Sequence, residues 1–312
     1  MKFDIFFSIC QTEIDGYMPS EKLMFEQFFD QLELADRLGF ETAWVAETHL
    51  SCEVQKHNPD AVIPHFKGEI GLNTDLLQLT HLAMARTRRI ALGSAIRNIL
   101  CNGGPLAHAE AVKTFLTLHG LQPSERRRLH LGFAAGRFPF SNSPYGIRPR
   151  HELEEAAWPV LKGLIFLQAT EIFLRALGKQ PFSSRELRPL RLERRMFREP
   201  GQWEAVTAKR EKQRDTAIDG GILVPPFWSF DRLGVIPFDA PLEFLQLVLG
   251  SHDPEVQILA NQYFPCWVFN LSITPSSIIE ATHQRMQKAY HPAGGPWHRS
   301  YMPRTSLIFI NG

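Results

Sequence analysis

The chain has 312 residues, and 44% of them are hydrophobic, which is enough apolar side chain for one large core. Its 34 Lys and Arg against 33 Asp and Glu leave a formal net charge of +1, which argues against a globally basic nucleic-acid-binding surface and against an acidic tail. Its four cysteines lie far apart, and its apolar runs are shorter than the roughly 20 residues of a membrane span. We therefore expect a cytoplasmic, globular chain without a signal peptide, a disulfide scaffold, a metal site or a membrane partner.

The first part of the sequence alternates short apolar runs with amphipathic stretches. An apolar stripe from Met24 to Leu38, with steps of three and four residues, predicts a helix that Gly39 ends. Two more helices are predicted at Asn73–Arg86, capped by Asn73 or Thr74, and at Pro105–His119, closed by Gly120. The strands predicted between them are Phe3–Ser8, Thr42–Ala46, Ile90–Ile96 and Leu129–Ala134. Four β–α units in a row predict a parallel sheet covered by helices.

The middle of the chain has a different pattern. His151–Leu177 is typical of a largely buried helix, which Pro159 is expected to kink or to divide. Arg185–Asp215 has ten Lys and Arg, six Asp and Glu, and little apolar periodicity. This segment indicates either a solvated excursion or a nucleic-acid patch, and the lack of interleaved aromatic residues favours the excursion. Ile222–Phe230 is apolar, but its paired prolines exclude a central strand.

The β–α alternation then resumes toward the end of the chain. Helices are predicted at Asp253–Tyr263 and Pro275–Tyr290. The remaining strands are predicted at Phe244–Leu249, Trp267–Leu271 and Ser306–Ile310. Together with the first four, these make seven strands of parallel type, the kind of strand from which a βα barrel is built.

In such a barrel the functional groups follow the C-terminal ends of the strands. The residues that this rule selects are Ser8, Glu47, His49, Ala95, Arg97, Asn98, Gly136, Arg137, Gly250–Asp253 and Asn270–Ser272. They include no metal-binding spacing and no paired acid dyad. We therefore expect a site that binds a ligand with polar side chains and backbone rather than with a metal ion.

Three groups within this set have specific interpretations, each with an alternative. Gly132–Arg137 has small residues that let a planar ligand approach, with Arg137 meeting a phosphate, or else it only packs a helix on a strand. Gly250–Asp253 opens a helix and is either an anion site or an ordinary cap. Glu47 and His49 point the same way on an extended segment, and His49 is either a base or a structural histidine.

Seven segments, in this order, resemble the bacterial luciferase-like flavin-dependent monooxygenases. They are Met1–Phe7 (MKFDIFF), Leu34–Ser51, Ala91–Ile99 (ALGSAIRNI), Pro105–Glu110, Leu129–Phe138 (LHLGFAAGRF), Leu247–Pro254 and Cys266–Leu271. The resemblance implies one TIM-type (β/α)8 barrel domain over residues 1–312, with a variable insertion at 170–241 after strand four. In the family's order Ser306–Ile310 is strand seven, so either the chain is shortened, the segment Ile222–Phe230 or a partner fills the gap, or the barrel is a reduced one.

The resemblance also implies a cofactor and its contacts. The family binds reduced FMN from a separate reductase and reacts it with O2, and a sister branch uses F420. By position, Ser251, Gly136 and Arg137 match phosphate contacts of the family, and Arg150 matches a second phosphate arginine. Ala95–Ile96 matches a non-prolyl cis peptide under the flavin ring. With Ser8 and His252 from the strand-end rule, these residues form the predicted cofactor site.

Several positions depart from the family pattern. Thr48 replaces the histidine that acts as the luciferase base, and alanines at 134 and 135 replace a cysteine and an arginine. The predicted catalytic residues are therefore His49 and Glu47. The insertion is expected to act as a lid that excludes water, with Phe227, Trp228 and Phe230 lining the pocket of a small organic substrate or, alternatively, serving as core. Three functions stay open: an FMN monooxygenase, an F420-dependent oxidoreductase and a non-catalytic flavin-binding protein. A homodimer is a further open prediction.

Overall fold

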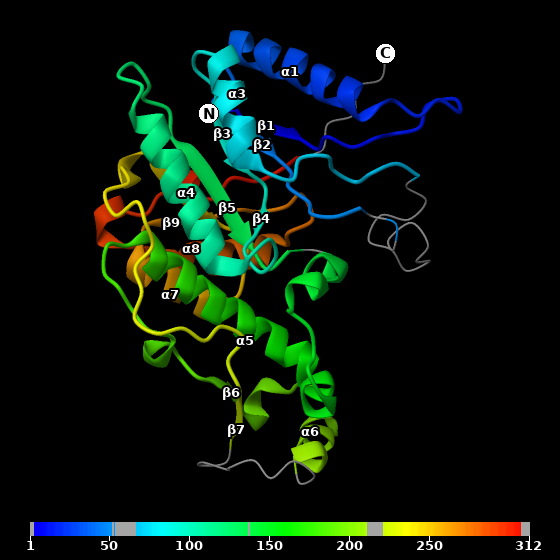
Figure 1. Ribbon diagram of the computed structural model, residues 1–312, viewed down its shortest axis with the longest axis vertical. Helices are drawn as coiled ribbons and strands as arrows, with labels where there is room; N and C mark the ends of the chain where they lie inside the picture. Colours follow the sequence, from blue (N-terminus) through cyan, green and yellow to red (C-terminus); the bar gives the residue numbers. More distant parts are fainter. Residues whose placement is uncertain (1–2, 52, 54–66, 137, 211–220, 307–312) are drawn as a thin grey trace.

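The computed structural model describes residues 3–51, 53, 67–136, 138–210 and 221–306, and it is built around one parallel sheet (Figure 1). The sheet has the order β1-β2-β3-β5-β8-β9, and a short strand, β4, also pairs with β5. The strands are β1 Ile5–Phe7, β2 Thr42–Val45, β3 Ala91–Ser94, β4 Arg97–Asn98, β5 Leu129–Ala134, β8 Leu245–Leu249 and β9 Cys266–Val268. The helices that alternate with them are α1 Glu21–Leu38, α3 Leu76–Arg86, α4 Gly104–Gly120, α5 Glu152–Leu177, α7 Pro254–Tyr263 and α8 Ser276–Ala289.

The strands divide their side chains between two cores, because successive residues of a strand point to opposite faces. Ala43 and Val45 of β2 join the large core between sheet and helices, whereas Trp44 between them joins a smaller cluster on the other face. That inner cluster also contains Val248 and Phe269. Gly93 makes room for it, since a Cβ there would lie 2.6 Å from the Trp44 ring. The inner face is thus a packed aromatic surface.

Most predicted elements are confirmed, and the differences are local. Gly39 ends α1 in the left-handed conformation, with φ of 87°. The predicted cap of α3 is wrong, because the carboxylate of Asp75 accepts from Leu77 N and Gln78 N, while the Asn73 amide donates to the carbonyl of Ala46. Aspartate is favoured at a helix N-cap because its carboxylate accepts such hydrogen bonds from the first free N–H groups of the helix.

The strand predicted over Ile90–Ile96 is interrupted. β3 ends at Ser94, and β4 begins at Arg97. Both pair with β5, but Gly93 faces His130 and Arg97 faces Phe133, so the interrupted strand holds one residue more than its partner. Such an insertion is a bulge, a feature that redirects side chains at the end of a strand.

A second, two-stranded sheet lies in the excursion that follows α5. Helix α5 runs unbroken through Pro159, so the predicted division of this helix is wrong. β6 Leu190–Leu192 and β7 Ile222–Val224 then pair antiparallel, and α6 Gln202–Arg210 packs on α5. Figure 1 shows this hairpin and α6 at the opposite end of the long axis from α1. The prediction that Ile222–Phe230 is no central strand is confirmed.

The segment after α8 returns to the main sheet. Asn270, just past β9, forms a parallel bridge with Arg304, and its N–H donates to the carbonyl of Pro303. This places the approach to the predicted seventh strand beside β9. The strand itself, Ser306–Ile310, lies outside the described residues except for Ser306.

A buried lysine connects α4 to the excursion. The Lys113 side chain has no exposed surface, and its ammonium group donates to the carbonyls of Ala176, Gly178 and Val235. Burial lowers the pKa of Lys113 from its usual value. A cation removed from water is tolerated when acceptors surround it. Lys113 therefore fixes the end of α5 and the return of the excursion against α4.

Lys113→Met is expected to lower the free energy of unfolding by about 2–4 kcal/mol, because it leaves buried carbonyls without a donor. Urea unfolding measures the loss. Lys162→Met, at an exposed position of α5, is the control and should change the free energy by less than about 0.5 kcal/mol. Equal effects of the two substitutions would contradict the anchoring role.

Candidate functional site

The C-terminal ends of the parallel strands form one rim, and the sequence-predicted site residues come from it. Ser8 follows β1, Glu47 follows β2, Gly136 follows β5, and Ser251 follows β8. The peptide bond between Ala95 and Ile96, in the bulge between β3 and β4, is cis, as the sequence analysis predicted. The rim is the edge at which parallel α/β folds hold their ligands.

Small residues form a flat apolar floor on the inner side of the rim. The Ile96 side chain lies across β5 and β8, because a Cβ at Gly132 would lie 2.9 Å from its Cδ1 and one at Gly250 would lie 3.1 Å from it. A Cβ at Gly250 would also lie 3.3 Å from that of Ala134. Glycine at 250 thus lets Ile96 lie low over the strand end, and glycine at 132 also avoids the carbonyl oxygen of Ser94, which would lie 2.1 Å from a Cβ there. A flat ring can rest on such a surface.

Two asparagines, which the sequence analysis did not pair, hold the loop after β5. The Asn98 amide donates to the Asn142 side-chain oxygen at 2.6 Å, and the Asn142 amide donates to the carbonyl of Ala135. Gly136 has φ of +79°, and a Cβ there would lie 2.2 Å from Asn98 Nδ2. Glycine at 136 therefore allows the loop to close against Asn98.

Glu47, His49, Arg97 and His108 form a buried group that we call the rim cluster. All four are at most 8% exposed. Arg97 Nη1 donates to Glu47 Oε2 at 3.1 Å, and Arg97 Nε donates to His108 Nδ1 at 2.7 Å. The second Glu47 oxygen, Oε1, lies 3.4 Å from His49 Nε2. The structure thus brings together the two predicted catalytic residues and adds two that the sequence analysis did not combine.

The electrostatics of the rim cluster follow from burial. Desolvation, with the charge of Arg97 as a smaller cause, lowers the pKa of His108 to about 3. His108 is therefore neutral, and because its Nδ1 accepts from Arg97, its proton lies on Nε2, 3.0 Å from the carbonyl oxygen of Cys101. Burial, together with the nearby charge of Glu47, raises the pKa of the Cys101 thiol to about 12. The thiol is consequently not a thiolate nucleophile.

Ser251 and His252 lie at the start of α7. Asp253 caps this helix by accepting from Glu255 N and Val256 N, so the capping interpretation of Gly250–Asp253 is confirmed. The Ser251 hydroxyl accepts from Asp253 N at 3.2 Å, and His252 Nε2 lies 3.0 Å from Asn270 Oδ1. Anion binding by Ser251 and His252 stays a prediction.

The other predicted cofactor contacts differ in their surroundings. Ser8 is exposed, and its hydroxyl lies 2.7 Å from Cys10 Sγ. Arg150 binds Glu154 and the carbonyls of Pro225 and Pro226, and its guanidinium stacks 4.1 Å from the centre of the Phe227 ring. Arg150 would therefore have to break these contacts to reach a phosphate. Arg137 lies outside the described residues.

The aromatic residues predicted to line a substrate pocket contact helices and the excursion itself. Phe227 packs against Trp158 of α5, and Phe230 packs edge-to-face on Phe182. Trp228 approaches Gly104 at the start of α4, where a Cβ would lie 2.9 Å from the indole nitrogen. All three are partly buried and pack against the large core, as the alternative prediction had it, and a role as a lid stays a prediction.

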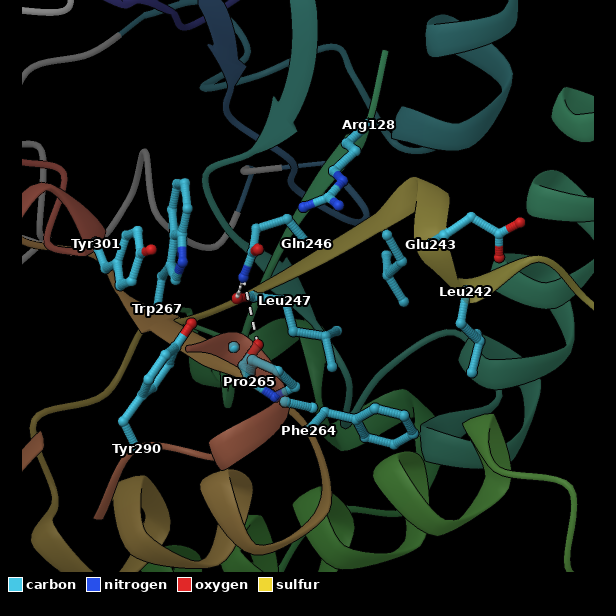
Figure 2. Close-up of a pocket in the computed structure, with 13 residues that line it drawn as sticks. Arg128, Leu242, Glu243, Gln246, Leu247, Phe264, Pro265, Trp267, Tyr290 and Tyr301 are labelled. Carbon is cyan, nitrogen blue, oxygen red and sulfur yellow. Dashed lines mark hydrogen bonds between the residues drawn. The ribbon is translucent and has the colours of Figure 1, made fainter. Parts of the chain in front are cut away.

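A hollow of about 520 Å³ lies at the opposite end of the sheet, around the N-terminal ends of β8 and β9. Figure 2 shows Arg128 near Gln246 on one side and Trp267, Tyr290 and Tyr301 on the other. The Gln246 amide is used within the wall, where it donates to the carbonyls of Leu247 and Pro265. No predicted site residue that the structure describes lines this hollow. We therefore place the functional site at the rim.

Within the described ranges, no group of three or more His, Cys, Asp or Glu side chains is placed to hold a metal ion. None of the helices in the same ranges combines the length and apolarity that a membrane span requires.

Gly136→Ala is expected to destabilise the protein more than Gly146→Ala. Both glycines are exposed and have positive φ, of +79° and +83°, but a Cβ at Gly146 would meet nothing within 4 Å. The shared backbone cost is about 1–2 kcal/mol, and displacement of Asn98 should add about 1–2 kcal/mol at Gly136 alone. Thermal unfolding of the two variants measures the difference, and equal losses would argue against the Asn98 contact.

His108 is expected to make stability depend on pH. In the unfolded chain this imidazole takes up a proton near the ordinary histidine pKa of 6.5, whereas folded His108 resists protonation down to about 3. The unfolded state therefore binds more protons in this window, and the free energy of unfolding falls as pH decreases, by up to about 1.4 kcal/mol per pH unit. His108→Gln should flatten this dependence in denaturant unfolding between pH 6.5 and 4. An unchanged slope would show that His108 already titrates normally.

Comparison with known proteins gives the following matches. The family model for luciferase-like monooxygenases matches residues 1–157, and a search of curated protein sequences found no match. Monooxygenase RslO1 from Streptomyces bottropensis is a structural neighbour, with 18% identity, 97% of this chain and 70% of that chain covered, and a TM-score of 0.60. The oxygenating constituent of 3,6-diketocamphane monooxygenase from Pseudomonas putida, in complex with FMN, has 14% identity and a TM-score of 0.54, with 97% of this chain and 66% of that chain covered. An F420-dependent secondary alcohol dehydrogenase has 14% identity and a TM-score of 0.53, with 97% of this chain and 67% of that chain covered.

These neighbours share the fold of this chain, which spans about two thirds of their length. They confirm the predicted TIM-barrel-type fold, although within the described residues β1 and β9 are the two ends of the sheet and do not pair. The family model covers half of the sequence and includes β1 to β5, together with Glu47, His49, Arg97 and the bulge at Ala95–Ile96. On that match, the chain belongs to the luciferase-like monooxygenase family.

Proposed function

We propose that this protein is a flavin-dependent monooxygenase that uses reduced FMN and O2 to oxygenate a small organic substrate. The observation that carries the proposal is the rim, where the C-terminal ends of the parallel strands bring both an apolar floor of Ile96, Gly132 and Gly250 and the buried pair of Glu47 and His49. Its support is the family match over residues 1–157. The floor can support a planar ring, and the pair of Glu47 and His49 can hold a proton.

The residues of the rim fit the ring of a flavin better than its phosphate. The floor is apolar and carries no side chain at 132 or 250, where a Cβ would approach Ile96 closely. Ser251 and His252 lie just before α7, where the phosphate is expected. The first N–H groups of α7 already donate to the carboxylate of Asp253. We propose that Ser251 and His252, with the backbone of Gly136, hold the phosphate.

The chemistry is divided between cofactor and protein. A bound reduced flavin supplies the electrons that activate dioxygen. The part of this chain is to orient the ring on the floor, to exclude water, and to hold or move a proton at His49, whose Nε2 faces Glu47 Oε1. His49 is the proposed base because threonine replaces histidine at position 48.

The proposal extends to the whole chain and its partners. We propose one barrel domain over residues 1–312, in which segment 170–241 excludes water from the rim. Its described part reaches the rim near Gly104 through Trp228. A separate reductase would supply the reduced FMN, and the homodimer stays a proposal that a mass measurement in solution can test.

The second candidate is an F420-dependent oxidoreductase. A structural neighbour with this cofactor has nearly the same TM-score as the FMN-bound neighbour, 0.53 against 0.54. Titration of the purified chain with FMN and with F420, followed by absorbance, separates the two. Binding of FMN together with substrate-dependent oxygen uptake in the presence of a reductase would support the monooxygenase. Flavin binding without any product by mass spectrometry would instead support a non-catalytic flavin-binding protein.

Ser251→Ala is expected to weaken FMN at least about fivefold and riboflavin less than about twofold, since a hydrogen bond to a charged group is worth about 1.5–3 kcal/mol. Fluorescence titration with both ligands measures this. Ser272→Ala, at the neighbouring strand end, is the control and should change neither affinity. Equal losses for FMN and riboflavin would remove Ser251 from the phosphate site.

A further inference from the structure

Arg97 connects the ends of three elements beneath His49. It is 2% exposed and belongs to β4, beyond the bulge. Its guanidinium bonds Glu47, which follows β2, and His108 of α4, and it lies 3.9 Å from the carboxylate of Asp75, the cap of α3. A buried guanidinium that spends its donors on residues from separate elements fixes those elements relative to one another.

These bonds determine which oxygen of Glu47 is available. Oε2 accepts from Arg97 Nη1 at 3.1 Å and from the backbone N–H of Leu76 at 3.0 Å. Oε1 has no hydrogen-bond partner among the described residues, and neither has His49 Nε2, although the two atoms are buried and 3.4 Å apart. Two buried polar atoms without partners are unfavourable. A small movement that brings them into a hydrogen bond relieves both.

His108 in turn fixes the guanidinium. It is 1% exposed, accepts from Arg97 Nε through Nδ1, and directs its own Nε2 at the carbonyl oxygen of Cys101. Because both ring nitrogens are used, the imidazole cannot rotate without losing a bond. The contacts therefore form one continuous path from Cys101 through His108, Arg97 and Glu47 to His49.

We infer that Arg97 and His108 are positioning residues that hold Glu47. In this position Glu47 Oε1 accepts a hydrogen bond from the Nε2–H group of His49. The other ring nitrogen of His49, Nδ1, is then free to take a proton. The inference rests on the base role proposed for His49. His49 Nδ1 forms no hydrogen bond with the described part of the chain. A base held by a third group through its distal nitrogen is a recurring arrangement of catalytic sites, and such contacts are often long before the ligand binds.

The test uses the protein without any cofactor. Protein labelled with 15N in histidine is examined by NMR for the imidazole N–H proton of His49, which is assigned by its loss in His49→Gln. A proton bonded to the buried Glu47 carboxylate should exchange slowly with water. We expect the signal in the native protein, its loss in Glu47→Gln, and exchange at least about tenfold faster in Arg97→Met, as the loss of the contact with Glu47 predicts.

Two further variants make the result specific. His108→Phe keeps the charge of Arg97 but removes its acceptor, so it should also speed exchange, and it replaces Arg97→Met if that variant does not fold. His119→Phe is the matched control, since His119 is an equally buried histidine of α4 that bonds the carbonyl of Arg127 near the N-terminal end of β5. This control should leave the His49 signal unchanged.

The outcomes separate this inference from the proposed function. Slow exchange that persists in Arg97→Met and His108→Phe, or no protected His49 proton in the native protein, overturns the positioning role whether or not flavin binds. With the signals as expected and an active FMN-loaded enzyme, Arg97→Met should lower kcat at least about tenfold and change the FMN Kd less than about threefold. In a His49→Gln background it should add no further loss, since the residues act as a unit.

Discussion

A charged guanidinium withdrawn from water must be paired, and at Arg97 this requirement organises the rim. A buried charge without a partner costs several kcal/mol, whereas hydrogen-bonded neighbours offset much of that cost. Arg97 meets its need with Glu47 and His108, which come from the end of β2 and from α4. The bulge before β4 is what turns Arg97 toward them. The geometry of the rim is therefore set by buried groups that hydrogen-bond one another.

The inner face shows a second constraint, which is the removal of side chains. Glycines at 93, 132 and 250 stand where a Cβ would meet Trp44 or Ile96, and the aromatic rings of Trp44 and Phe269 fill the space beneath them. Glycine in a strand costs conformational entropy, so it stands where a close approach requires it. Here the glycines let an apolar surface form level with the strand ends, next to the charged cluster. The apolar floor thus comes from β5, β8 and Ile96, whereas the buried ionic group comes from the end of β2, from β4 and from α4.

The sequence was sufficient for the features that depend on local periodicity. The short apolar runs of β2 and β5, the apolar stripe of α1 and the cap at Asp253 are all short-range patterns. It was not sufficient for the bulge after Ser94, because the bulge depends on the register with β5. It was also not sufficient for the contact of Arg97 with His108, because no local pattern around His108 indicates this contact. The one sequence feature that pointed to these contacts was the position of Arg97 and Asn98 directly after a predicted strand. Contacts between residues far apart in the chain need the fold to become visible.

The phosphate end of the rim differs from the ring end in how its groups are already used. Asp253 places a carboxylate at the first turn of α7, where a helix would otherwise attract an anion, and Arg150 is held by Glu154 and two proline carbonyls. A phosphate arriving there meets one fixed negative charge and displaces existing bonds, whereas a planar ring on the floor displaces none. In the proposed site, contact with the ring would therefore contribute more to binding than Arg150, whose charge is already paired.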